Sequence, residues 1–229
     1  MQSFWVTRDQ QQLRQRQSGR LDAGSRGAAT GGAQMAAIEA LVVEILEATG
    51  LKRLHIHTGK ALELPGYFRP EKKWDLLVVA DDQLVTAIEL KSQVGPSFGN
   101  NFNNRTEEAI GSASDLWTAY REGRLGHGPR PFLGYLFLLE DCPAVHRPVK
   151  NAEPYFAVDP ILRKASYSTR YEVLCRRLIL ERLYDAACLT LTTHETNTRI
   201  SHPAEDLTFQ RFVAELQGGA YRFVRGRSP

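Results

Sequence analysis

The stretch Phe132–Glu140 (FLGYLFLLE) constrains the fold most, because it is apolar almost throughout. A strand that is apolar on both faces has to be covered on both faces, as a central strand between two layers of helices is. Amphipathic helix patterns and further strand patterns alternate along the rest of the chain, which favours an α/β fold with one sheet. The expected helices span residues 34–49, 106–122, 168–185 and 206–217, and the other expected strands span 51–57, 74–80, 84–91 and 187–193.

The N-terminal segment differs from the rest of the chain in charge. Residues 1–33 contain five arginines and two aspartates and so carry the whole net charge of +3. A basic end on a neutral body fits contact with nucleic acid, and it equally fits a solvated arm that keeps the protein soluble. Because residues 18–32 are rich in Gly, Ala and Ser, we expect a basic arm over 1–33 joined flexibly to one domain over 34–229.

Two apolar strands, 74–80 and 84–91, are separated only by Asp81-Asp82-Gln83. If these three residues form the loop, Asp75 lies opposite Glu89 with Cβ atoms roughly 4.5–5.5 Å apart. A two-residue loop would instead turn the two acids to opposite faces of the sheet. Since Asp tolerates the left-handed conformation that three-residue loops use, we expect the three-residue loop.

Two carboxylates opposed across a ladder are destabilising unless a cation lies between them. Mg²⁺ is a hard cation that binds one or two protein carboxylates together with phosphate oxygens. Lys91 lies on the same face as Glu89, where its ammonium group could orient a water molecule and stabilise negative charge. The pattern therefore suits metal-assisted phosphodiester hydrolysis, although an exposed salt-bridge trio at a sheet edge is the alternative interpretation.

With these residues identified, the sequence resembles the PD-(D/E)xK nuclease superfamily and, within it, the XhoI family of type II restriction endonucleases. One departure is that Trp74 precedes Asp75 where the superfamily pattern has proline. The similar segments run through most of the chain: TGGAQM (30–35), ELPGYFRPEKKWDLLVV (63–79), ELKSQVGPSFGNNFNNRTEEAIGSA (89–113), LWTAYREG (116–123), GYLFLLEDC (134–142) and YEVLCRRL (171–178).

The resemblance implies a restriction-endonuclease-like core, a mixed sheet flanked by helices. It implies a homodimer that uses Mg²⁺ to cut both strands of the palindrome CTCGAG after the first C, leaving 5′ phosphates and 5′ overhangs. It carries Asp75, Glu89 and Lys91 onto the catalytic positions, and the metal is expected at Asp75, Glu89 and Leu90. A cognate DNA methyltransferase is expected in the same host, and no organic cofactor is implied.

Many enzymes of this superfamily add an acid from the first core helix, and three glutamates there are candidates. Glu47 points away from the apolar stripe, whereas Glu39 and Glu44 flank it. The resemblance favours Glu44 as the additional catalytic residue. An ordinary solvated helix charge is the alternative for each of the three.

The segment Ser92–Arg105, which follows the active-site strand, is expected to be a polar loop that contacts DNA. Asn and Gln can bond adenine edges and Arg can read guanine. The alternative is a polar turn that caps the next helix from Asn104 or Thr106. The DNA-contact candidates are Gln93, Asn100, Asn101, Asn103, Asn104 and Arg105, together with Arg69 in the preceding loop.

Other classes of protein are excluded by the sequence. No apolar run approaches the ~18 residues of a membrane span, so no membrane contact is expected. The three cysteines show no paired spacing, which indicates reduced thiols in a cytoplasmic protein. The rival hypotheses are another nuclease on this scaffold, such as a repair nickase or a junction resolvase, and a DNA-binding protein without catalysis. The complete set of Asp75, Glu89 and Lys91 argues against the last.

Overall fold

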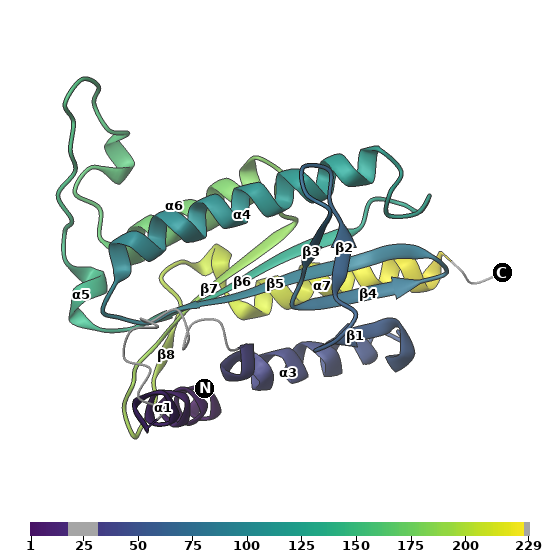
Figure 1. Cartoon of the computed structure of the whole chain (residues 1–229), viewed down its shortest axis with the longest axis horizontal. Coiled ribbons are helices and arrows are strands. Elements are labelled where there is room, and N and C mark those ends of the chain that lie inside the picture. Colours follow the sequence, from purple (N-terminus) through teal and green to yellow (C-terminus); the bar gives the residue numbers. More distant parts are fainter. Residues whose placement is uncertain (18–31, 227–229) are drawn as a thin grey trace.

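The computed structural model describes residues 1–17 and 32–226. Its main feature is a mixed sheet of six strands in the order β1-β4-β5-β6-β7-β8 (Figure 1). The three central strands, β5, β6 and β7, run parallel, and the outer pairs are antiparallel. The bounds are β1 (Ile56–Thr58), β4 (Leu76–Ala80), β5 (Gln83–Gln93), β6 (Phe132–Glu140), β7 (Ala186–Thr192) and β8 (Ile200–Ser201), with β2 (Glu63–Pro65) and β3 (Glu71–Lys73) forming a separate hairpin.

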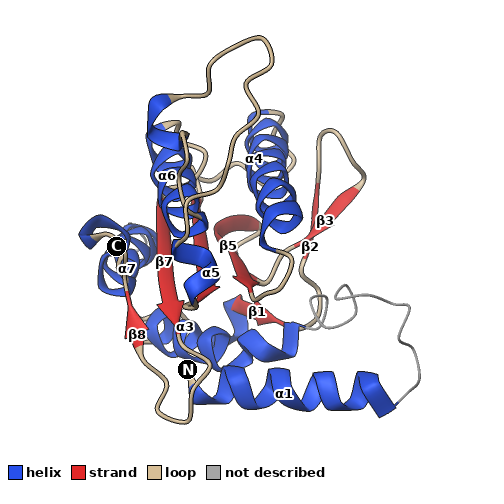
Figure 2. Cartoon of the chain, turned by 90° about the vertical axis from the view of Figure 1, so that its left-hand side faces the viewer, coloured by secondary structure: helices blue, strands red, loops and turns tan. Residues whose placement is uncertain are grey.

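Helices cover both faces of this sheet. Helices α4 (Phe98–Arg121) and α6 (Tyr167–Leu180) pack on one face, and α3 (Ala36–Glu47) and α7 (Phe209–Arg225) pack on the other (Figures 1 and 2). Every residue of β6 except Glu140 is buried, which confirms the expected central strand and the expected α/β fold, a mixed sheet flanked by helices. Within the described ranges, none of the helices combines the length and the apolar character needed to cross a bilayer. The remaining short elements are α5 (Pro143–His146) and 3₁₀ turns at Gly32–Met35, Arg53–His55, Pro160–Leu162 and Glu205–Leu207.

The N-terminal helix α1 (Gln2–Gln17) is packed onto the body of the protein. Phe4 and Trp5 are 1% and 4% exposed, and the Trp5 indole donates a hydrogen bond to the Thr192 hydroxyl at 3.3 Å. The Trp5 ring also stacks on the His194 ring, with 4.2 Å between centroids. The expected boundary at residue 33 therefore does not coincide with a gap in packing. The expected flexible connection lies almost wholly outside the described residues.

The β4–β5 hairpin reaches the expected register by an unexpected route. Ala80 pairs with Gln83, so the loop has two residues, Asp81 and Asp82, both with positive φ. A bulge then follows: Val79 pairs with Leu84 and Val78 with Thr86, which leaves Val85 as an extra residue. Such a bulge shifts the register by one residue. The three-residue loop was wrong, but the bulge restores the pairing of Leu76 with Ile88.

The expected loop Ser92–Arg105 is also wrong, because α4 begins at Phe98. Phe98 is buried against the Tyr167 ring, and Phe102 packs edge-on against Tyr171. These aromatic side chains, four residues apart, anchor the first turns to the core. Tertiary packing of this kind outweighs the low helix propensity of Gly and Asn.

Two shorter stretches differ from expectation as well. Leu41, which the spacing of apolar residues over 34–49 predicts to be buried, is 43% exposed, and Val43 is buried instead. The expected loop over residues 58–73 contains the β2–β3 hairpin, in which Leu64 pairs with Lys72. This hairpin stands beside α4 (Figure 1).

Candidate active site

Asp75, Glu89 and Lys91 meet at one end of the β4–β5 hairpin. The Lys91 Nζ atom lies 2.5 Å from Glu89 Oε1 and 3.3 Å from Asp75 Oδ2, so one ammonium group bridges both acids. The Asp75 amide donates to the Ile88 carbonyl at 3.3 Å, which extends the ladder as far as the acid. The Leu90 amide donates to Asp75 Oδ2 at 2.8 Å. The two carboxylates and the lysine therefore lie on the same side of the sheet.

Glu89 is the most deeply buried member of this set, with 4% of the residue exposed. Its second oxygen, Oε2, accepts a hydrogen bond from Lys72 Nζ at 2.6 Å. Burial by itself would raise the pKa of Glu89, but the ammonium groups of Lys91 and Lys72 outweigh burial and lower the pKa below its ordinary value. Glu89 is therefore held ionised inside the protein.

Lys91 is charged for the reciprocal reason. Burial lowers the pKa of Lys91, but the negative charges of Glu89 and Asp75 outweigh it and hold the pKa above its ordinary value. A lysine in this state cannot act as a base. It can donate hydrogen bonds and stabilise negative charge.

Of the three acids on α3, Glu39 is the one that the structure brings near the site. Glu39 is half-buried, and both its burial and the negative charge of Asp75 raise its pKa. Glu44 and Glu47 are exposed, and Glu47 pairs with Arg53 at 3.9 Å. The structure thus favours Glu39 over Glu44, because the charge of Asp75 acts on Glu39, whereas Glu44 is exposed.

The donor set fits a hard divalent cation that keeps part of its water shell. Leu90 has an apolar side chain, 5% exposed, so only its main-chain carbonyl could contribute an oxygen. Within the described part of the chain, no three His, Cys, Asp or Glu side chains gather in a way that could hold a metal ion. Asp75 and Glu89 side by side match the way in which proteins bind Mg²⁺ through one or two carboxylates beside substrate phosphates.

The DNA-contact candidates fall into different environments. Asn100, Asn103 and Asn104 are exposed on the first two turns of α4, and Asn101 is half-buried beside them. Gln93, by contrast, is 3% exposed and donates to the Val94 carbonyl at 3.0 Å. Its amide is therefore not available to a base edge, and Gln93 leaves the set of candidates.

The two arginine candidates are both paired with acids. Arg105 Nη1 lies 2.6 Å from Glu108 Oε2, and its positive charge acts on Lys91. Arg69 lies at the tip of the β2–β3 hairpin, where its Nε donates to Asp115 Oδ2 at 2.8 Å. The side chain of Arg69 is 42% exposed and that of Arg105 is 18% exposed, so Arg69 has the freer access to a ligand.

Sequence reasoning missed Lys72 and Asp115. Lys72 is half-buried between the exposed residues Glu71 and Lys73, a strand alternation that three residues of sequence are too short to reveal. Asp115 lies on α4, and its side chain, 3% exposed, accepts hydrogen bonds from the amides of Tyr67 and Phe68 at 2.8 Å each. An acid directly before the apolar pair Leu116-Trp117 of this helix was the available signal for Asp115.

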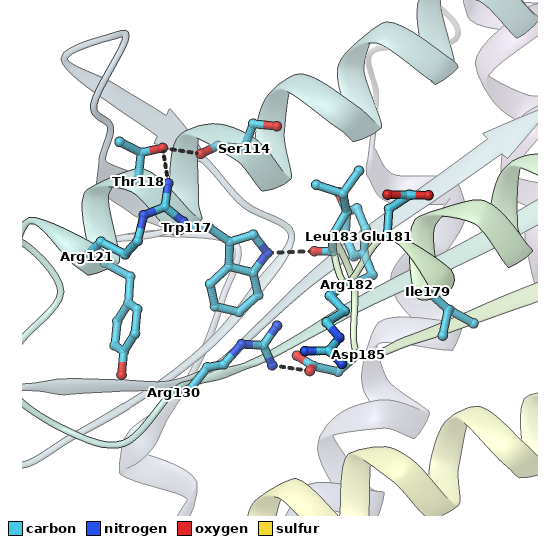
Figure 3. A pocket seen from close by; sticks show the side chains of 12 residues that line it. Ser114, Trp117, Thr118, Arg121, Arg130, Ile179, Glu181, Arg182, Leu183 and Asp185 are labelled. Atoms are coloured by element: carbon cyan, nitrogen blue, oxygen red, sulfur yellow. Dashed lines mark hydrogen bonds and ion pairs between the residues drawn. The ribbon is translucent and has the colours of Figure 1, made fainter.

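A pocket of about 850 Å³ lies elsewhere, between the C-terminal ends of α4 and α6 (Figure 3). None of the candidate catalytic residues lines it. Its polar walls are paired: the Trp117 indole donates to the Leu183 carbonyl at 2.8 Å, and Arg130 pairs with Asp185. This pocket therefore lies apart from Asp75, Glu89 and Lys91, the acids and the lysine that converge at the hairpin end.

Comparison with known proteins agrees with the geometry of the hairpin end. The chain matches the family model described as restriction endonuclease XhoI over residues 14–203. It is 46% identical over 202 residues to the type II restriction enzyme BstVI of Geobacillus stearothermophilus, with 85% of this chain and 90% of that protein covered. Identity is 54% over 155 residues with the type II restriction enzyme AbrI of Azospirillum brasilense, with 67% and 69% covered.

A third relative is the type II restriction enzyme XhoI of Xanthomonas vasicola, 52% identical over 164 residues, with 71% of this chain and 66% of that protein covered. No solved structure matches the chain. The family model spans most of the sequence and includes the whole β4–β5 hairpin with its two acids and its lysine. The chain therefore belongs to the XhoI family of restriction endonucleases and is a type II site-specific deoxyribonuclease.

Proposed function

We propose that this enzyme uses Mg²⁺ to cut both strands of the palindrome CTCGAG after the first C, leaving 5′ phosphates and 5′ overhangs. The proposed cleavage chemistry is supported by one observation, the convergence of Asp75 and Glu89 on Lys91. The resemblance to XhoI-family enzymes supports the recognition sequence, because the XhoI of Xanthomonas vasicola is 52% identical over 164 residues.

Asp75 and Glu89, with the Leu90 carbonyl, are the groups that would hold the metal. Bound there, Mg²⁺ would supply a more acidic water and positive charge against the scissile phosphate. Lys91 has a different task, because its ammonium group is fixed between the two acids. It can donate a hydrogen bond that orients the attacking water, and it can stabilise the negative charge that develops on the phosphate. Glu39 is the further acid that we assign to this site in place of Glu44.

The first turns of α4 are the proposed DNA-reading surface, since they begin five residues after Gln93, at the end of the catalytic strand. Asn100, Asn103 and Asn104 present exposed amides that can bond base edges in the major groove. The amides of the helix N-terminus favour a nearby phosphate. Asn101, Arg105 and Arg69 complete the proposed contacts.

The proposal includes a homodimer, because one chain holds one set of Asp75, Glu89 and Lys91, whereas a palindrome offers two equivalent scissile bonds. A dimer with two-fold symmetry matches the symmetry of such a site. The enzyme would act in the cytoplasm, alongside a methyltransferase that protects the host's own CTCGAG sites.

A plasmid digest with and without Mg²⁺, followed by sequencing of the ends, tests this function. We expect discrete fragments that end at CTCGAG only when Mg²⁺ is present. Asp75→Ala and Lys91→Ala should each lower the cleavage rate by at least about 10²-fold while the far-UV circular dichroism stays that of the wild type. Nicked circles alone would indicate a nickase, and a gel shift without cleavage would indicate a binding protein. Either result contradicts the proposal, as would wild-type cutting by either variant.

A further inference from the structure

The buried carboxylate Glu89 carries a separate ammonium group on each of its two oxygens. Lys91 Nζ lies 2.5 Å from Oε1, and Lys72 Nζ lies 2.6 Å from Oε2. The side chains of Lys72 and Glu89 are 12% and 5% exposed, so this second pair is largely removed from water. Ion pairs at such depth are weakly screened by salt, and breaking one from one side leaves an uncompensated buried charge.

Lys72 reaches Glu89 from outside the main sheet. It lies on β3 of the β2–β3 hairpin, and its Nζ atom also lies over the Trp74 ring, 4.1 Å from the centroid. The same atom donates to the Lys73 carbonyl at 3.2 Å. Three separate interactions thus hold one ammonium group against the carboxylate that is expected to bind the metal.

The charges of this cluster balance without any metal. Asp75 and Glu89 contribute two negative charges, and Lys91 and Lys72 contribute two positive charges. A divalent cation that entered the intact cluster would add two positive charges beside Lys91 and Lys72, against which Glu39 sets one negative charge at most, and such an excess in a partly buried site is costly. The carboxylate oxygen that Lys72 holds is moreover occupied by a short hydrogen bond.

The backbone that carries Lys72 is fixed, so its release would be a side-chain movement. At the hairpin tip the buried Asp115 accepts hydrogen bonds from the Tyr67 and Phe68 amides and from Arg69. Arg124 also donates to the Gly66 carbonyl at 2.8 Å. A lysine side chain has a flexible stem of four carbons, so its ammonium group can leave its partner without a change in the hairpin backbone.

We propose that Lys72 is the built-in counter-ion of the metal-free site, which competes with the divalent metal for Glu89 and is released from it when the metal binds. The inference rests on the proposed function, because it assumes that Glu89 is a metal ligand. Lys72 is thereby a positioning residue: it keeps Glu89 buried, ionised and oriented until the metal replaces it.

The test is Mn²⁺ binding to the purified protein without DNA, measured by isothermal titration calorimetry, with thermal unfolding in EDTA alongside. Lys72→Met should bind Mn²⁺ about tenfold more tightly than the wild type and should unfold at a lower temperature in EDTA. Lys72→Arg, which keeps the positive charge, should restore wild-type behaviour in both measurements. Lys73→Met removes an exposed ammonium group from the same strand and should change neither.

Glu89→Gln separates the inference from the function on which it rests. Suppose that the wild type binds Mn²⁺ and that Glu89→Gln abolishes this binding. If Lys72→Met then fails to bind Mn²⁺ more tightly than the wild type, competition by Lys72 is refuted, although the metal site is supported. If the wild type binds no Mn²⁺, the metal site itself is refuted and the inference falls with it. A fall in stability of Lys72→Met without any gain in affinity would show a merely structural lysine, and that also overturns the proposal.

Acetylation of the wild-type protein supplies a test that does not depend on a variant folding. In EDTA, Lys72 should react slowly with an amine acetylating reagent, because its ammonium group is held by Glu89. Mn²⁺ should make Lys72 several-fold more reactive, as measured by peptide mass spectrometry, while the exposed Lys73 reacts equally in both conditions. Unchanged reactivity of Lys72 would contradict its release.

Discussion

Glu39 and Glu89 show opposite pKa shifts, although both are shielded from water near the same site. Glu89 faces two ammonium groups that outweigh its burial and lower its pKa, whereas the pKa of Glu39 is raised by burial and by Asp75. Ionised Glu89 therefore stabilises the fold, with a contribution present above the unfolded pKa of about 4.3 and lost as the pH falls through its folded pKa. Ionised Glu39 destabilises the fold, and an acid whose pKa is raised beside another carboxylate is a candidate for a functional site.

Because ionised Glu39 destabilises the fold, the structure predicts how Glu39→Gln changes stability. In EDTA, the variant should unfold at a higher temperature than the wild type at pH 8, because the repulsion from Asp75 is removed. The advantage should shrink as the pH falls and vanish well below the unfolded pKa of about 4.3, where Glu39 is protonated in both states. Cleavage with Mg²⁺ should fall about 10- to 100-fold, the usual cost of losing a group that supports a metal ligand.

Glu44→Gln is the matched control on the same helix, since Glu44 is exposed. It should leave both the unfolding temperature and the cleavage rate unchanged. A loss of cleavage in Glu44→Gln but not in Glu39→Gln would contradict the assignment and return Glu44 to the site.

At the residue scale, the sequence predicts what lies on one strand pair and little beyond it. Asp75, Glu89 and Lys91 could be placed together because strand alternation and hairpin pairing are local rules. Lys72 and Glu39 could not, because their proximity depends on how a hairpin and a helix pack on the sheet. The predicted DNA contact of Gln93 was wrong for the same reason, since the burial of this side chain is set by tertiary packing.

Among the elements, the β4–β5 hairpin has the predicted register near Asp75 and Glu89, although the predicted three-residue loop was wrong. The two-residue turn alone would have turned Asp75 and Glu89 apart, and the extra residue Val85 reverses that shift. A bulge has no reliable sequence signature here, because Val85 continues an ordinary apolar strand pattern. The pairing of Asp75 with Glu89 could be predicted from the sequence, but the two-residue turn and the bulge that together produce this pairing could not.

The start of α4 is the element that sequence reasoning misjudged most. Glycine and asparagine between residues 99 and 104 predict a loop by composition, but Phe98 and Phe102 dock the segment on the core as a helix. The three exposed asparagines among the proposed DNA contacts consequently lie on a helix, which sets their spacing.

This arrangement predicts that Phe98→Ala weakens DNA binding without touching DNA. Phe98 is 6% exposed, and loss of such a ring costs about 3–5 kcal/mol of unfolding free energy. The amides of residues 98–105 should exchange hydrogen faster than in the wild type, and DNA affinity should fall. Ile110→Ala, at a site 42% exposed on the same helix, should change stability by no more than about 0.5 kcal/mol. Unchanged exchange over 98–105 in Phe98→Ala would refute the anchoring role.

For the whole molecule, the decisive quantity is the number of catalytic sets that act on one DNA duplex. Each chain of 25.7 kDa contributes one. Light scattering should therefore give twice this mass, and the wild type should convert supercoiled plasmid to linear DNA. Mixed dimers of wild type and Asp75→Ala should produce nicked circles, because only one strand meets an intact site. A monomeric mass would contradict the dimer, and linear product without nicked circles from purified mixed dimers would contradict the assignment of one strand to each catalytic set.

The proposed cleavage mechanism depends most on a divalent cation bound by Asp75 and Glu89 beside Lys91. Anomalous X-ray scattering from a crystal of the enzyme with Mn²⁺ measures this directly. We predict an anomalous peak within coordination distance of one oxygen of each acid, with Lys72 withdrawn from Glu89. A peak elsewhere, or no peak at the end of the hairpin at saturating Mn²⁺, would contradict the account.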